Sequence, residues 1–276
     1  MKNRFLIIIL IIFQLSAKAI DKDSIVVTYI ANCGFLIEME STKIIIDGLF
    51  INGFNYYDTP DSSTLDLILK GSEPFDNIDY VFITHKHADH FDAKTVSSFM
   101  IKNVGSKLIC PKQVDDELKT DDKSYNLFSQ RVIECTPATF ISKTFNLDAL
   151  TIFGYRLAHM NERNKHIENV AFLIEIEDKS IFHTGDADPN QVNKYSGKKP
   201  SDKSIDIAFI NGAFGNYKNF EITNDFIDAD TNVAMHFPKD FFKIEHEMIK
   251  DVPDFFREPT VFKELMEKQI FYMTKQ

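Results

Sequence analysis

Apolar and polar positions along the chain predict an ordered series of strands and helices. Three apolar runs at 25–31, 35–39 and 43–46 are separated by turn residues, which predicts an opening meander of three strands. Later strands are expected at 78–83, 107–110, 131–135, 149–156, 170–176, 179–182, 204–210 and 231–235. Helices are expected at 62–69, 93–102, 111–119 and 239–250. The alternation of strands and helices indicates an α/β (α+β) class.

Residues 1–19 have a different pattern from the rest of the chain. Lys2 and Arg4 precede an unbroken apolar run at 5–13, and Ala17-Lys18-Ala19 has the small-x-small form of a cleavage site. These features are typical of a secretory signal peptide. The apolar run is too short to span a bilayer, so no stable membrane insertion is expected after cleavage near Ala19. We expect a single domain at 20–276, in the periplasm or secreted.

Composition and charge narrow the class of partner. A chain of 276 residues with 44% hydrophobic content can bury a sizeable core, and a two-sheet sandwich reaches this length as one domain. Cleavage would remove three of the 31 basic residues and none of the 41 acidic ones, which moves the formal net charge from −10 to −13. An acidic protein repels polyanions, which argues against nucleic acid and favours a small-molecule substrate. The composition leaves the oligomeric state open.

The chain has three cysteines, Cys33, Cys110 and Cys135. In an oxidising compartment Cys110 and Cys135, which both end predicted strands, are candidates for a disulfide. The alternative is that all three are small buried residues. The chain has no C-x-x-C spacing, from which we expect no cysteine zinc site.

The densest group of polar side chains lies in residues 83–92, Ile-Thr-His-Lys-His-Ala-Asp-His-Phe-Asp. His85, His87, Asp89 and His90 offer imidazole nitrogen and carboxylate oxygen, which a borderline ion such as zinc prefers. The first two can project the same way from an extended loop, and the last two can turn toward a second ion. The loop joins a predicted strand to a predicted helix, where α/β folds place chemistry. A metal site is therefore predicted, against the alternative of a solvated polar loop.

The H-x-H-x-D-H pattern of residues 85–90 resembles that of the metallo-β-lactamase superfamily of hydrolases. The resemblance covers almost the whole mature chain, and it implies a four-layer αββα sandwich. A strand followed by a ligand loop occurs twice, at 78–90 and 180–188, as in a sandwich built from two similar halves.

The resemblance also implies the remaining metal ligands. His159 follows a predicted strand, and Asp186 in a Gly-Asp pair would bridge both ions through its two oxygens. Asp188 is the rival carboxylate but fits better as a helix cap before Pro189. His236 ends a late strand. The implied sets are His85, His87 and His159 for one metal and Asp89, His90 and His236 for the other, with Asp186 between them.

Supporting residues and a substrate wall are expected around these ligands. The resemblance makes Asp47, at the end of the opening hairpin, a candidate for orienting a metal-bound histidine. His183 is expected either to support the site from behind or to pack in the core. Aromatic residues in loops 49–60 and 211–220 either contact substrate or hold the loops on the core. The candidates for substrate contact are Phe50, Tyr56, Tyr57, Phe214 and Tyr217.

The expected function is an exported di-zinc hydrolase that cleaves a small ester, lactone, thioester or phosphoester. Two divalent ions about 3.5–4 Å apart lower the pKa of a bridging water, so that hydroxide is available at neutral pH. The resemblance implies that Asp89 orients this hydroxide and takes its proton. No cysteine matches the second-metal ligand of zinc β-lactamases, which argues against antibiotic hydrolysis. Iron or manganese could replace zinc, and a di-iron oxidoreductase or a non-catalytic metal-binding module are the alternatives.

Overall fold

The computed structural model describes residues 20–121, 123–215, 224–239, 241 and 259–273. The predicted signal peptide at 1–19, Tyr217 and most of the predicted helix 239–250 lie outside the described residues. No helix in the described part of the chain has both the length and the apolar character needed to cross a membrane.

The first of two seven-stranded sheets contains the opening meander and a parallel run. Its strands, in spatial order, are β14 (Lys268–Tyr272), β1 (Ser24–Ala31), β2 (Gly34–Glu38), β3 (Lys43–Ile46), β4 (Tyr80–Phe82), β5 (Lys107–Cys110) and β6 (Val132–Glu134). β1, β2 and β3 are antiparallel neighbours, whereas β3 to β6 are parallel. The parallel strands require crossovers, which α1 (Ser62–Lys70), α2 (Ala93–Lys102) and α3 (Lys112–Asp121) supply.

The second sheet repeats this plan. Its strands, in spatial order, are β13 (Thr260–Val261), β12 (Ala229–Met235), β11 (Ile205–Asn211), β10 (Lys179–His183), β9 (Asn169–Ile176), β8 (Leu150–Leu157) and β7 (Ser142–Leu147). β7 to β10 are antiparallel, and β10 to β13 are parallel. An antiparallel meander joined to a parallel run thus occurs in both sheets.

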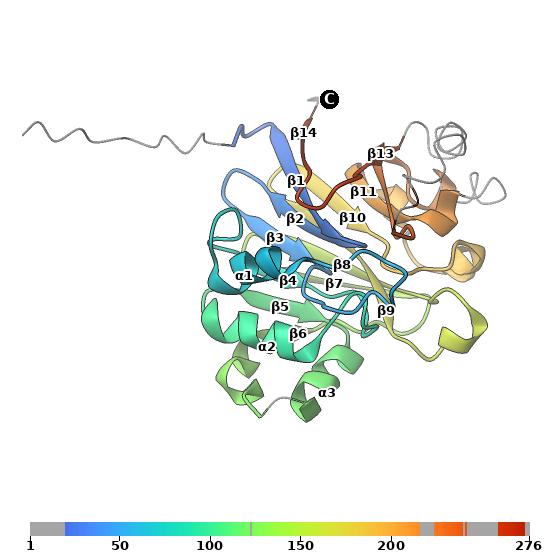
Figure 1. Cartoon of the computed structure of the whole chain (residues 1–276). Helices are drawn as coiled ribbons and strands as arrows, with labels where there is room; N and C mark the ends of the chain where they lie inside the picture. The colour runs from blue at the N-terminus through green and yellow to red at the C-terminus, as the bar shows by residue number, and fades with distance from the viewer. Residues whose placement is uncertain (1–19, 122, 216–223, 240, 242–258, 274–276) are drawn as a thin grey trace, which may run out of the picture.

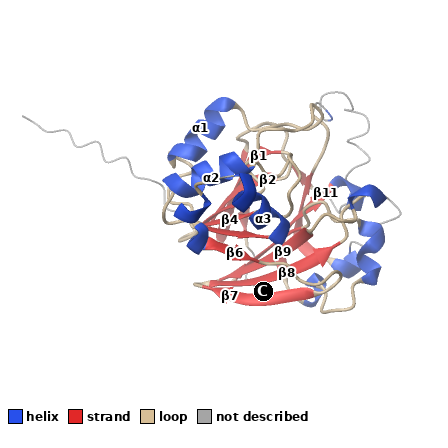
Figure 2. Ribbon diagram, turned by 90° about the horizontal axis from the view of Figure 1, so that it is seen from below, coloured by secondary structure: helices blue, strands red, loops and turns tan. Residues whose placement is uncertain are grey.

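Helices flank the paired sheets on two sides, as Figures 1 and 2 show. One hydrophobic cluster, with Phe35 and Phe209 in contact at 4.5 Å between ring centroids, fills the space between the sheets. A second lies between the first sheet and α1 to α3, and a third covers the outer face of the second sheet. Because both faces of each sheet are covered, the central strands β2 and β9 are mostly apolar and almost entirely buried. The predicted αββα sandwich is confirmed.

Local signals explain where the helices begin and end. The Asp61 side chain accepts the Thr64 N–H at 2.7 Å and caps α1, which ends at Gly71 with a left-handed φ of 60°. Asp92 caps α2 in the same way through Thr95. The short β7 was not predicted, because its residues alternate between exposed and half-buried at the edge of the second sheet.

Candidate metal centre

The predicted ligands converge at one edge of the sandwich, where strands of both sheets end. His85, His87, Asp89 and His90 follow β4, and His159 follows β8. Asp186 follows β10, and His236 follows β12. Ligand loops at the carboxyl ends of parallel strands meet at the same edge of a sheet. Residues far apart in the chain therefore contact one another, as in the ion pairs between His85 and Asp186 and between Asp89 and His236, which are 147 positions apart.

The first group of donors has the geometry of a metal position. One ligand atom from each of His85, His87, His159 and Asp186 lies within 4.8 Å of the others. The Nε2 atoms of His85 and His159 face each other at 3.2 Å. Donors at 2.0–2.1 Å from a tetrahedral zinc ion are separated by about 3.3 Å.

The tautomers of these histidines favour a cation between them. The Nδ1 of His159 lies 2.8 Å from the carbonyl oxygen of Met160, so it donates its proton there. The Nδ1 of His85 lies 3.0 Å from the hydroxyl of Thr84, which itself donates to a carboxylate. With Nδ1 protonated, each Nε2 presents a lone pair to the other, an arrangement that a bound metal ion stabilises. The residues therefore fit the metal that the sequence implied.

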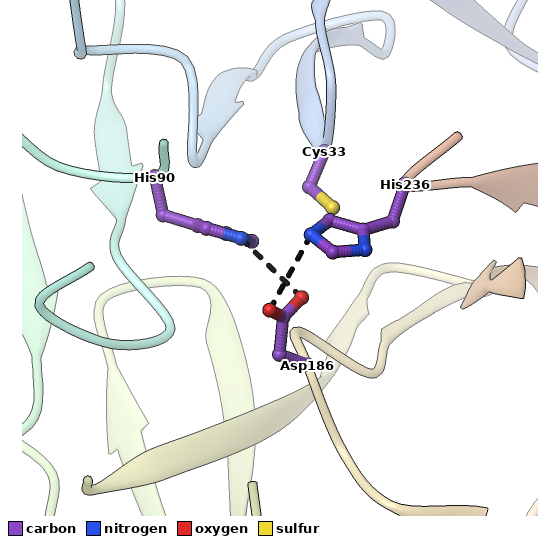
Figure 3. Close-up of side chains that lie close together, drawn as sticks. All are labelled: Cys33, His90, Asp186 and His236. Carbon is purple, nitrogen blue, oxygen red and sulfur yellow. Dashed lines mark ion pairs between the residues drawn. The ribbon is translucent and has the colours of Figure 1, made fainter. Parts of the chain in front are cut away.

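A second group of donors lies on the other side of Asp186. Ligand atoms of Cys33, His90, Asp186 and His236 lie within 4.8 Å of one another, and Figure 3 shows them converging. Asp89 is outside this group, with its Oδ2 at 3.4 Å from His236 Nε2 and 3.8 Å from His90 Nε2. Two adjacent groups that share one carboxylate are suited to a pair of ions.

Asp186 lies between the two groups and faces both. Its Oδ2 is 3.4 Å from the Nε2 atoms of His159 and His236, and its Oδ1 is 3.3 Å from that of His90. Burial by itself would raise the pKa of Asp186, but the imidazoles of His236 and His90 outweigh it and hold that pKa well below its usual range. The carboxylate is therefore ionised and can bridge two cations.

Asp47 contacts His90 of the second group on the ring edge away from the metal position, in the place expected for a residue that orients a metal-bound histidine. Its Oδ2 lies 2.8 Å from His90 Nδ1, which leaves His90 Nε2 directed at the metal position. The same carboxylate accepts the Thr84 N–H at 2.7 Å and the Thr84 hydroxyl at 2.6 Å. Thr84 then holds His85, so one buried carboxylate orients a histidine in each group.

His183 supports the site without reaching it. Its Nδ1 accepts the Gly185 N–H at 3.1 Å, so its Nε2 carries the proton and donates to the Cys33 carbonyl oxygen at 3.0 Å. The ring also stacks on Phe209 in the core. Burial lowers the pKa of His183, consistent with the neutral form that these two hydrogen bonds require.

The aromatic residues proposed to contact substrate have different positions. Tyr57 packs against His236 in a tilted arrangement, with 4.3 Å between ring centroids, and lines an open cavity of about 350 Å³ over the donors. Tyr56 is exposed, packs edge-to-face with Tyr57 and is not among the residues that line this cavity. Phe50 and Phe214 are fully buried, so their prediction as substrate contacts is wrong in this structure. Core packing takes up both rings, and Phe214 belongs to the third hydrophobic cluster.

The cysteines differ most from expectation. Cys110 and Cys135 are both free, and they face opposite sides of the first sheet, one toward the helices and the other toward the second sheet. No disulfide joins them. The absence of C-x-x-C spacing predicted no cysteine zinc site, but Cys33 lies in the second donor group, close enough to His90, Asp186 and His236 to share a metal ion with them. The sequence signal that could have indicated Cys33 is its place in the turn after the first strand, because the predicted metal ligands also follow strands.

A glycine permits the close approach of Asp186 to its neighbours. Gly185 has a left-handed φ of 54°, and a Cβ there would lie 2.4 Å from Asn169 Oδ1. We expect Gly185→Ala to lower the free energy of unfolding by about 1–3 kcal/mol through strain and overpacking. Metal affinity should fall as well, because Asn169 Oδ1 accepts the Asp186 N–H. Chemical denaturation of the metal-free protein measures the first effect, with Gly105→Ala as the control, since nothing lies within 4 Å of a Cβ at residue 105.

The metal-free protein should lose stability in mild acid. Burial, followed by the nearby imidazole of His159, lowers the pKa of His87 to about 4 from 6.5. Between these values the unfolded chain binds a proton that the folded state does not. The contribution of neutral His87 to the free energy of unfolding is therefore fully present above pH 6.5 and decreases as the pH falls toward 4. We expect His87→Gln to reduce this decrease and the exposed control His166→Gln to leave it unchanged, as measured by urea denaturation at pH 7 and pH 4.5. An unchanged pH dependence in His87→Gln would contradict the assignment.

Comparison with known proteins agrees with this geometry. The family model described as a beta-lactamase superfamily domain matches residues 65–228, which include the donors from His85 to Asp186. No curated protein sequence matches the chain.

Several solved structures share its fold. Igni18, a metallo hydrolase from the archaeon Ignicoccus hospitalis, is 17% identical, with a TM-score of 0.60 over 91% of this chain and 100% of its own. YhfI, a metallo-beta-lactamase fold protein from Bacillus subtilis, is 16% identical, with a TM-score of 0.57 over 91% of this chain and 100% of its own. CmlA, a diiron β-hydroxylase from Streptomyces venezuelae, is 13% identical, with a TM-score of 0.52, and this chain covers 54% of it.

The family match spans more than half of the chain, and both sheets, their flanking helices and the His/Asp cluster have the arrangement that the motif predicted. The chain therefore belongs to the metallo-β-lactamase superfamily.

Proposed function

We propose that this protein is an exported hydrolase that binds two zinc ions and cleaves a small ester, lactone, thioester or phosphoester. The observation that carries the proposal is the position of the buried Asp186 carboxylate between two groups of histidines, with its oxygens 3.3–3.4 Å from the Nε2 atoms of His90, His159 and His236. All ligands implied by the sequence lie at this one site. A non-catalytic binding module would not require an open cavity over a complete set of donors.

Two bound metal ions would supply an activated water at neutral pH and would polarise the oxygen that gains negative charge during attack. The chain itself contributes Asp89, which lines the cavity beside the donors. The Asn32 side-chain amide donates to the Asp89 carbonyl oxygen at 3.1 Å and lies 3.3 Å from its carboxylate. Held in this way, Asp89 can orient a water molecule and accept its proton.

The cavity supports a small substrate. Its volume of about 350 Å³ is at the lower end of ligand pockets, and Phe54 and Tyr57 give it an apolar wall. Asn161 and Arg163 add polar groups to the lining of the same cavity. A folded nucleic acid would meet a protein of net negative charge, so we propose a small molecule as the substrate.

Export is proposed from the sequence alone. The basic start, the apolar run and the small-x-small site at residues 17–19 support a cleaved signal peptide and a periplasmic or secreted protein.

A second candidate is a di-iron oxidoreductase. The first donor group contains only imidazole and carboxylate, which suit iron as well as zinc. CmlA, a diiron enzyme, has a similar fold. The ion itself therefore distinguishes the two candidates.

Elemental analysis of the mature protein, purified without chelator, tests both. We expect two zinc ions per chain, lost in the double variant His87→Ala, Asp186→Ala and retained in the control His166→Ala, whose side chain is exposed. A hydrolysis screen over esters, lactones, thioesters and phosphodiesters would follow. Two irons and a visible absorption band would favour the oxidoreductase, and a chain that binds no metal even after addition of zinc would refute both.

A further inference from the structure

Cys33 lies in the turn between β1 and β2, on the interior side of the second donor group. Figure 3 shows its sulfur directed toward His236 and Asp186, and His90 approaches Asp186 from the side opposite His236. The side chain is fully buried and is not among the residues that line the cavity over the donors. Its sulfur nevertheless lies within 4.8 Å of the ligand atoms of all three neighbours.

The turn is held in place by contacts on both sides of Cys33. Its carbonyl oxygen accepts a hydrogen bond from His183, and the preceding Asn32, with a left-handed φ of 49°, donates to Asp89. The following Gly34 packs so closely that a Cβ there would lie 2.9 Å from the carbonyl oxygens of Ala31 and Asp47. The position of Cys33 therefore does not depend on a mobile loop.

The neighbouring polar atoms form ion pairs with one another and with Asp89, but they make no hydrogen bonds among the described residues. His90 Nε2, His236 Nε2 and Asp186 Oδ1 are buried, and none of them makes a hydrogen bond within the described part of the chain. Leaving such atoms without a hydrogen bond is costly, which is the mark of a site completed by something else. A cysteine that only filled the core would have apolar neighbours on this side instead of three converging donors.

We propose that Cys33 is a thiolate ligand of the second metal position, together with His90, His236 and Asp186. This inference rests on the proposed function, because it requires that the metal centre forms. Thiolate and imidazole are ligands that zinc prefers, with Zn–S distances of about 2.3 Å and Zn–N distances of about 2.0–2.1 Å. The ligand is supplied from the first hairpin, before any residue of the histidine motif.

Two consequences follow for the site. The second position becomes softer than the first, which has only imidazole and carboxylate, so it should favour zinc or cobalt over manganese. Asp89 is outside the four-donor group and faces the cavity, so it remains available to a water molecule or the substrate.

Cobalt titration of the chelator-treated mature protein tests the proposal. A thiolate bound to Co²⁺ gives a ligand-to-metal charge-transfer band in the near ultraviolet, whereas imidazole and carboxylate do not. We expect this band in the wild-type protein and in Cys135→Ala, a buried cysteine outside both donor groups, and its loss in Cys33→Ala. Affinity for the second cobalt ion should fall in Cys33→Ala by at least the roughly 10–100-fold that loss of an outer partner costs.

The outcomes separate this proposal from the function it rests on. Two cobalt ions per wild-type chain without the charge-transfer band would overturn the role of Cys33 and leave the di-metal site standing. Unchanged cobalt affinity in Cys33→Ala would overturn it as well. No cobalt binding at all would overturn the proposed function and this inference together. The wild-type spectrum decides the question even if Cys33→Ala does not fold.

Discussion

Replacing Asp186 by alanine is expected to abolish binding of the second metal ion and to weaken the first, with a loss of the proposed hydrolytic activity of at least about 100-fold. The carboxylate faces His159 and His236 with one oxygen and His90 with the other. No other carboxylate belongs to both donor groups in the described part of the chain. Loss of an outer partner alone costs 10–100-fold in metal affinity, so loss of the shared ligand should exceed this.

Metal content per chain and a chelator competition assay would measure the effect of Asp186→Ala. Asp188→Ala is a matched control, because Asp188 is a carboxylate two residues away that caps the helical turn η4 (Pro189–Lys194) by accepting the Asn190 N–H. The Asp188→Ala variant should lose about 1 kcal/mol of the free energy of unfolding and retain both metal ions. Equal metal loss in the two variants would contradict the bridging position of Asp186.

Replacing Asp47 by alanine should lower both stability and metal affinity. The buried carboxylate accepts hydrogen bonds from the Thr84 N–H, the Thr84 hydroxyl and His90 Nδ1. Each donor left without a partner costs about 1–3 kcal/mol, and His90 loses the contact that directs its Nε2. We therefore expect a loss of several kcal/mol in the metal-free protein and a loss of roughly 10–100-fold in zinc affinity.

Urea denaturation and zinc competition measure these two effects of Asp47→Ala. Asp47 has a left-handed φ of 46°, which asparagine adopts more readily than alanine, so Asp47→Asn separates loss of the charge from backbone strain. Asp47→Asn should still weaken zinc binding, because its amide nitrogen cannot accept from a donor. Wild-type zinc affinity in Asp47→Asn would show that the carboxylate does not orient His90.

Features that depend on neighbours in the chain were predictable from the sequence. The opening strands β1 to β3 end within two residues of their expected limits, since apolar runs and turn residues are local signals. Asp92 lies at the predicted helix start because its side chain needs only the N–H three residues later. The ligand order was also readable, because histidines and carboxylates at strand ends form a linear pattern that the family resemblance completes.

Features that depend on distant contacts were decided by the tertiary structure. Phe50 and Phe214 lie in aromatic loops beside candidate ligands, but packing buries both rings, and nothing in the local pattern separates them from Tyr57, which does line the cavity. Cys110 and Cys135 end adjacent strands, yet their side chains face opposite sides of the sheet. Strand ends are visible in a sequence, whereas the face on which a terminal side chain lies depends on register.

Cys33 shows the same division most clearly. By itself the sequence determined an α/β fold with strands in known order and a histidine-rich metal loop after one of them. Only the folded chain brought the turn after β1 to Asp186, more than 150 residues away, and placed a sulfur among the buried atoms of His90 and His236. Periodicity and turn chemistry act over a few residues, whereas a metal position is formed by side chains that meet only after both sheets have paired.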